Sequence, residues 1–139
     1  MGFRDYHGKE HLYRAIIEGI NYTLRWAVER MEQKKKSRIE RVKVTGGGAE
    51  SETICQMTAN MFGRDAIRME TTDTTSLGAA MLGYVALGRY GSFQEAAGCM
   101  TRPGKVYHPQ KETQAVYDQI YPEYIKDLER RIHFNVKRG

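Results

Sequence analysis

The chain of 139 residues is long enough for one domain with a single hydrophobic core. Its 40% hydrophobic and 28% charged residues exclude a disordered or fibrous protein, and its two cysteines lack the spacing of a disulfide framework or CxxC motif. Because no apolar run is long enough to cross a bilayer, we expect a cytoplasmic protein with no membrane partner.

The net charge of +5 comes mainly from a basic cluster between Arg30 and Lys43. Such a cluster could bind RNA, so a basic RNA- or protein-binding module is one possible function. A solvated helix end followed by a strand face explains the same residues more simply. We therefore expect no nucleic-acid partner.

The first predicted element is a long amphipathic helix over residues 9–33. Its apolar residues recur at steps of four and three, which places them on one face of the helix. They are Leu12, Ile16, Ile20, Leu24, Ala27 and Met31. The helix is therefore expected to be amphipathic along its whole length.

A strand over residues 38–45 is predicted next, because β-branched residues alternate there before three glycines. Helices are then predicted at 50–62, 74–87, 92–99 and 111–132, and a short strand at 66–69. Ser51 is available to cap the first of these helices, and Gly63 is placed to end it.

The succession strand, helix, strand predicts a right-handed crossover and a parallel pair of strands. Two strands are too few for an independent sheet with this many helices around it. The sequence therefore predicts a fragment whose partner strands lie upstream. We expect an uncovered apolar surface beside strand 38–45, and from it a homo-oligomer.

The glycine turn Thr45-Gly46-Gly47-Gly48-Ala49-Glu50-Ser51 joins the end of the first strand to the next helix. Glycines let the backbone approach a ligand, and the start of a helix presents unpaired N–H groups with a partial positive charge. The carboxyl end of a strand in a parallel sheet is also a usual place for ligands. This turn is therefore the candidate phosphate-binding site.

Two standard phosphate motifs fit this turn less well. A P-loop is excluded, because no Gly-Lys-Ser/Thr closes the turn. A dinucleotide-binding oxidoreductase is the closer alternative, since Gly46-x-Gly48-x-x-Ser51 follows a strand and Glu70 comes about 20 residues later. Against it, Ser51 replaces the third glycine, and a long helix precedes what should be the first strand.

The order and spacing of several motifs resemble the C-terminal domain of FGGY-family carbohydrate kinases, closest to xylulokinases, with glycerol kinases in the same family. The motifs include the glycine turn with Gln56 and Gly63, and the stretch from Glu70 through Asp73 to Leu77-Gly78-Ala79-Ala80. His11-Leu-Tyr-Arg14-Ala15 upstream and Gly88-x-Tyr90-x-Ser92 downstream also match. The resemblance covers nearly the whole chain.

The resemblance implies an α/β fold of the actin-like, RNase H-like ATPase type, with helices packed on a short, incomplete parallel sheet. It implies that Gly46, Gly47 and Gly48 lie against the phosphates of ATP, with Ala49 and Ser51 toward the adenosine. The full-length parent would be a sugar kinase, a phosphotransferase that moves the γ-phosphoryl group of ATP to a sugar hydroxyl. Residues 1–139 would be one domain fragment, the nucleotide-side part.

The same resemblance places the general base, the Mg²⁺ ligands and most sugar contacts in a preceding N-terminal part. No catalytic or metal-binding residue is therefore assigned in this chain, and the chain alone is expected to be inactive. His7 and His11 have a spacing found in metal sites, but no third ligand accompanies them. Tyr117, Tyr121 and Tyr124 are expected to form a packing stripe rather than a base-stacking platform.

Overall fold

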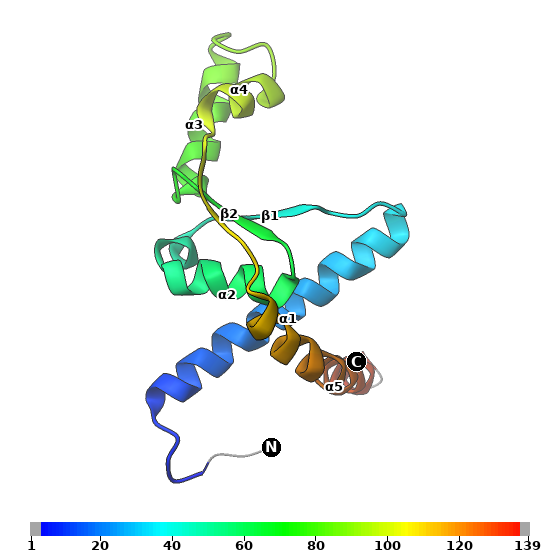
Figure 1. The fold of residues 1–139 in the computed structure, drawn as a ribbon. Helices are drawn as coiled ribbons and strands as arrows, with labels where there is room; N and C mark the ends of the chain where they lie inside the picture. Colours follow the sequence, from blue (N-terminus) through cyan, green and yellow to red (C-terminus); the bar gives the residue numbers. More distant parts are fainter. Residues whose placement is uncertain (1–3, 137–139) are drawn as a thin grey trace. The chain divides into compact units, whose positions relative to one another are not determined.

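The computed structural model describes residues 4–136, with side chains up to residue 131. The elements are α1 (Lys9–Lys35), β1 (Arg41–Val44), the 3₁₀ helix η1 (Gly47–Glu50), α2 (Glu52–Phe62), β2 (Asp65–Met69), α3 (Thr74–Ala86), α4 (Phe93–Met100), β3 (Pro103–Tyr107) and α5 (Lys111–Val136) (Figure 1). All five predicted helices are present. The second was predicted to begin at residue 50, but α2 begins at Glu52, because residues 47–50 form the 3₁₀ helix η1.

The sheet differs from the prediction. It has three strands in the order β1-β2-β3, of which β1 and β2 are parallel and β2 and β3 antiparallel. The predicted parallel pair is confirmed, but the sheet is mixed rather than parallel throughout, because strand β3 was missed. β3 contains Pro103 and Gly104, which normally indicate a turn rather than a strand. Within the described residues, β1 has a partner on one edge only.

The chain separates into two compact units, each described by itself. The first contains residues 1–39, 60–63 and 109–139, and so holds α1 and α5. The second contains residues 40–59 and 64–108, and so holds the sheet, η1, most of α2, and the pair α3 and α4.

In the first unit, α1 and α5 pack through tyrosines. Tyr22 of α1 is buried, and its ring lies 6.1, 5.7 and 5.0 Å, centroid to centroid, from Tyr117, Tyr121 and Tyr124 of α5. Arg25 completes this contact, because its guanidinium lies 4.1 Å from the centre of the Tyr121 ring. The prediction that the three tyrosines of α5 form a packing stripe is confirmed.

The predicted helix is present, but its apolar face is not the face that contacts α5. Its leucines and isoleucines remain about half exposed, whereas the buried residues of this helix are Asn21 and Tyr22. Aromatic stacking and hydrogen bonds, rather than aliphatic contact, hold α1 against α5. The periodicity therefore located the helix correctly but not the face that packs.

In the second unit, α2 packs on the sheet around a small core. This core consists of Ala49, Cys55, Ala59, Ala66 and Tyr107, with Val44 of β1 packed against it. Small side chains allow α2 and η1 to approach the strands closely. The core therefore fixes the segment between β1 and α2, where the glycines lie.

Candidate nucleotide site

The glycine turn begins directly after β1. Gly46 has φ +79° and ψ −174°, a backbone conformation that is essentially restricted to glycine. Its carbonyl accepts a hydrogen bond from the N–H of Ala49 at 3.0 Å, which starts η1. The chain thus changes from strand to helix within a few residues.

A second loop lies beside the turn, because β1 and β2 are parallel and their carboxyl ends meet at one edge of the sheet. The N–H of Gly46 donates to the carbonyl of Thr72 at 2.8 Å. The Glu50 carboxylate accepts hydrogen bonds from the Thr72 hydroxyl and, at 3.4 Å, from Arg68. These contacts hold the turn and the loop over residues 70–73 together.

The next helix starts from this loop. The Asp73 carboxylate accepts a hydrogen bond from the N–H of Ser76 at 3.1 Å and so caps the first turn of α3. Hydrogen bonds from Ser76 lower the pKa of Asp73, which is therefore ionised at neutral pH. Sequence reasoning gave no role to Glu50, Arg68 or Thr72, and only Asp73 carried a recognisable signal, a capping residue before a helix.

The backbone of the first two glycines is open to approach. A Cβ atom built on Gly46 or Gly47 would meet no atom within 4 Å, and one on Gly48 would meet only a methyl group of Ile54 at 3.9 Å. Packing inside this chain therefore does not require glycine at these positions. The exposed backbone is what a phosphate group needs for close contact.

Ala49 and Ser51 have different surroundings. Ala49 is fully buried, and its carbonyl lies 3.5 Å from the sulfur of Cys55, so only its backbone could face a ligand. The Ser51 hydroxyl accepts a hydrogen bond from the N–H of Ile54 at 3.4 Å, as predicted for a capping residue. Burial raises the pKa of the Cys55 thiol, which thus remains protonated and serves in packing.

The described residues contain no group of three or more His, Cys, Asp or Glu side chains that could hold a metal ion. His7 and His11 lie with ring centroids 5.4 Å apart, and each Nδ1 accepts a backbone N–H near the start of α1, from Arg4 and Gly8 respectively. No described helix is long and apolar enough to cross a membrane.

The structure thus contains a mixed sheet, with a glycine turn after β1 and a second loop after β2. The sequence profile of the FGGY family of carbohydrate kinases, C-terminal domain, matches residues 1–87. The chain belongs to this family. A dinucleotide-binding oxidoreductase and a basic RNA- or protein-binding module are not favoured, since this match includes the glycine turn.

Relatives of this FGGY-family chain agree with the profile. It is 30% identical to the xylulose kinase of Bacillus subtilis over 137 residues, which are 99% of this chain and 26% of that protein. It is 37% identical to glycerol kinase 2 of Saccharolobus solfataricus over 87 residues, 63% of this chain and 17% of that protein. The chain therefore spans about a quarter or less of the length of these relatives.

Solved structures show the same fold. A ligand-bound xylulose kinase from Lactobacillus acidophilus superposes with a TM-score of 0.75 and 27% identity, covering 100% of this chain and 28% of that one. A gluconate kinase from the same organism superposes with a TM-score of 0.73 and 28% identity, covering 94% and 26%. The actin-like ATPase fold expected from the sequence is confirmed as a portion of that fold.

Proposed function

We propose that residues 1–139 form the C-terminal, nucleotide-side part of an ATP-dependent carbohydrate kinase, in which the glycine turn contacts the phosphates of ATP. The observation that carries this proposal is the open backbone of Gly46 and Gly47 at the carboxyl end of β1, in a chain of the FGGY family. In the longer protein, the γ-phosphoryl group of ATP passes to a sugar hydroxyl.

Each residue of the turn has its own part in this proposal. The backbone of Gly47 and Gly48 contacts the phosphates, and the backbone conformation of Gly46 directs these two residues toward them. Ala49 anchors the turn in the core, and Ser51 caps α2 beside the adenosine. The hydrogen bonds that Glu50 accepts from Thr72 and Arg68 hold the turn in position in the absence of ATP. This preorganisation lowers the entropic cost of ATP binding.

The remaining parts of the reaction lie outside this chain in our proposal. The general base, most sugar contacts and the Mg²⁺ ligands belong to the N-terminal part of the longer protein. Mg²⁺ would neutralise charge on the transferring phosphoryl group. Relatives named xylulose, glycerol and gluconate kinases leave several sugars and polyols as candidate substrates. We also propose a cytoplasmic location, and a homo-oligomer stays a prediction.

The test is Gly47→Val in the longer kinase that contains this chain. The added side chain occupies space meant for phosphate, so we expect the KM for ATP to rise about tenfold or more and the KM for sugar to change little. Gly98→Val in α4 is the matched control, because a Cβ there also meets no atom within 4 Å. Equal losses for both substrates in a folded Gly47→Val protein would refute the proposal.

A further inference from the structure

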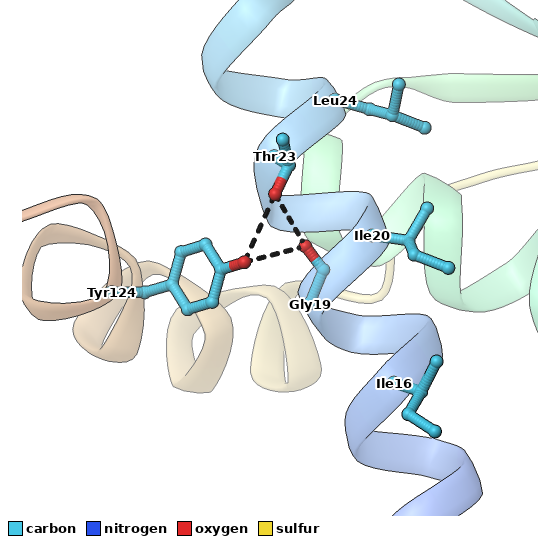
Figure 2. A pocket seen from close by; sticks show the side chains of 6 residues that line it. All are labelled: Ile16, Gly19, Ile20, Thr23, Leu24 and Tyr124. Carbon is cyan, nitrogen blue, oxygen red and sulfur yellow. Dashed lines mark hydrogen bonds between the residues drawn. The ribbon is translucent and has the colours of Figure 1, made fainter. Parts of the chain in front are cut away.

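Two pockets of the first unit differ in their chemistry. The first, the apolar pocket, lies beside Tyr124 and has a volume of about 400 Å³. Tyr124 donates a hydrogen bond to the carbonyl of Gly19 at 3.0 Å, and Thr23 bonds both that carbonyl, at 3.0 Å, and the Tyr124 hydroxyl, at 3.1 Å. Figure 2 shows that the aliphatic side chains of this pocket point away from the triangle of polar atoms: Ile16, Ile20 and Leu24. Its polar groups are therefore satisfied within the chain.

The second, the polar pocket, lies between the first half of α1 and the first half of α5. It is lined by residues from the ranges 7–18 and 112–120, and its volume of about 680 Å³ is typical of sites for small molecules. Three of its lining side chains are apolar, Ala15, Val116 and Ile120. The others carry hydrogen-bonding groups, so the pocket suits a ligand that is polar but also has C–H groups.

The most buried polar groups of the polar pocket belong to Tyr117 and Glu18. Tyr117 is 5% exposed, and its hydroxyl donates to Oε1 of Glu18 at 2.9 Å. Arg14 donates to the same carboxylate oxygen through Nε at 2.8 Å, and to the Tyr117 hydroxyl through Nη2 at 3.4 Å. Among the described residues, Oε2 of Glu18 has no hydrogen-bond partner. One carboxylate oxygen, on a side chain only 25% exposed, is therefore left to accept a hydrogen bond from a ligand.

Hydrogen-bond donors line the same pocket. Arg14 uses Nε and Nη2 in the contacts above, so Nη1 remains as a donor. Nδ1 of His11 accepts the N–H of Gly8 at 3.1 Å, and Nε2 therefore carries a hydrogen whether the ring is neutral or protonated. The Thr113 hydroxyl and the Glu112 carboxylate make no hydrogen bond to any described part of the chain. The pocket thus combines unused donors with unused acceptors.

The charges of the lining select against ions. A phosphate or carboxylate would meet the two carboxylates of Glu18 and Glu112 beside the single guanidinium of Arg14. A small cation would pair with the carboxylates, but it would be repelled by Arg14 and would leave the donors of the pocket unused. A hydroxyl group donates and accepts at once, so neighbouring hydroxyls can bond a carboxylate and a guanidinium together.

We propose that the polar pocket binds a neutral polyhydroxylated small molecule, a sugar or polyol. Its hydroxyl groups donate to Oε2 of Glu18 and accept from Nη1 of Arg14, and its C–H groups lie against Val116, which is 54% exposed without a ligand. The polar pocket shares no residue with the glycine turn, so the inference goes beyond the proposed function and does not depend on it.

The test is a titration of the 139-residue chain with xylitol, followed by NMR of isotope-labelled alanine and threonine methyl groups. The methyl groups of Ala15 and Thr113 report on the polar pocket, and that of Thr23 reports on the apolar pocket. We expect saturable shifts at Ala15 and Thr113, with a dissociation constant of about 1–10 mM, because the ligand is small and polar. Shifts that rise linearly at all three methyl groups, or no shift at all, would overturn the inference.

Two pairs of variants locate the binding. Ala15→Phe fills the polar pocket, and Ala115→Phe is its matched control, since Ala115 is exposed and lines neither pocket. We expect the saturable shift at Thr113 to vanish in the first variant and to persist in the second. Glu112→Gln should weaken binding about threefold or more, and Glu123→Gln, an exposed carboxylate elsewhere on α5, by less than about twofold. The same result for both members of either pair would contradict the proposal.

Putrescine and inorganic phosphate are the competing ligands, and each should bind about tenfold or more weakly than xylitol. Tighter binding of putrescine would mean that the carboxylates select a cation, and tighter binding of phosphate that Arg14 selects an anion. Either result would overturn the inference. If circular dichroism shows that the chain is unfolded, the same methyl signals are followed in a chimera in which it replaces the matching segment of the Bacillus subtilis xylulose kinase. The titration contains no ATP, so the nucleotide site and the polar pocket can each fail alone.

Discussion

The N–H of Gly46 donates to the carbonyl of Thr72 at 2.8 Å, which ties the turn after β1 to the loop after β2. Beyond this bond, the positive φ of Gly46, +79°, changes the direction of the chain from strand into η1. The two loops are therefore held together at the carboxyl edge of the parallel strands. A ligand at this edge would meet both.

Gly46→Ala is expected to destabilise the protein, whereas Gly47→Ala is not. The conformation of Gly46 costs a residue with a Cβ about 1–3 kcal/mol, although the space around it is open. Gly47 has neither a positive φ nor a close neighbour. Urea unfolding of both variants checks this difference, and equal free energies of unfolding would show that the Gly46 backbone is not strained by a side chain.

The isolated chain should bind ATP weakly or not measurably, even with Mg²⁺ present. It offers one wall of the proposed site, and the described residues include no group that could hold the metal. Titration calorimetry with ATP and Mg²⁺ is the direct measurement. A micromolar dissociation constant, about −8 kcal/mol of binding free energy, would mean that the glycine turn suffices without the rest of the kinase.

The sequence was most informative where local signals act alone. Ser51, Gly63 and Asp73 lie where helices start or end, and hydrogen bonding or a positive φ explains each of them. The glycine turn was likewise located correctly between β1 and α2. These features depend on a few neighbouring residues, so periodicity and capping rules are sufficient to find them.

Features that depend on distant residues could not be predicted in this way. Nothing near Glu50 in sequence indicates that its carboxylate accepts a hydrogen bond from Thr72. The packing face of α1 is set by Tyr22 and Arg25, because their partners lie on α5. Periodicity ranks aliphatic residues above these two, so it locates the helix but not the face that contacts α5.

Strand β3 shows the same limit and leads to a prediction for Gly104. The pairing of β2 and β3 is irregular between Ile67 and Met69, and a Cβ on Gly104 would lie 2.8 Å from the carbonyl oxygen of Arg68. Glycine in a strand often marks such a close approach of two backbones. The obstacle is backbone, so rotation of a side chain cannot relieve it.

Gly104→Ala should therefore lower the free energy of unfolding by about 2 kcal/mol or more. Gly98→Ala in α4 is the control, because it meets open space and should have little effect or slightly stabilise the helix. Thermal unfolding of the two variants makes the comparison. A Gly104→Ala protein as stable as the wild type would mean that β2 and β3 can separate at this point without cost.

The tyrosine contact between α1 and α5 should make stability depend on alkaline pH. Burial, and next the charge of Glu18, raise the pKa of Tyr22 to about 12, compared with about 10 for an exposed tyrosine. Burial also raises the pKa values of Tyr117 and Tyr121. The folded state thus holds these protons at a pH where the unfolded chain has released them.

A raised folded-state pKa stabilises the protein fully below pH 10, and this contribution is lost as pH rises from about 10 to about 12. Tyr22→Phe keeps the ring but removes the hydroxyl that donates to the carbonyl of Tyr117 at 3.2 Å. We expect a loss of about 1 kcal/mol at pH 8. The variant should also lose less stability than the wild type between pH 9.5 and 11.5, since one of the three shifted tyrosines is gone. Urea unfolding at several pH values measures both effects, and an unchanged pH dependence would show that Tyr22 ionises as an exposed tyrosine does.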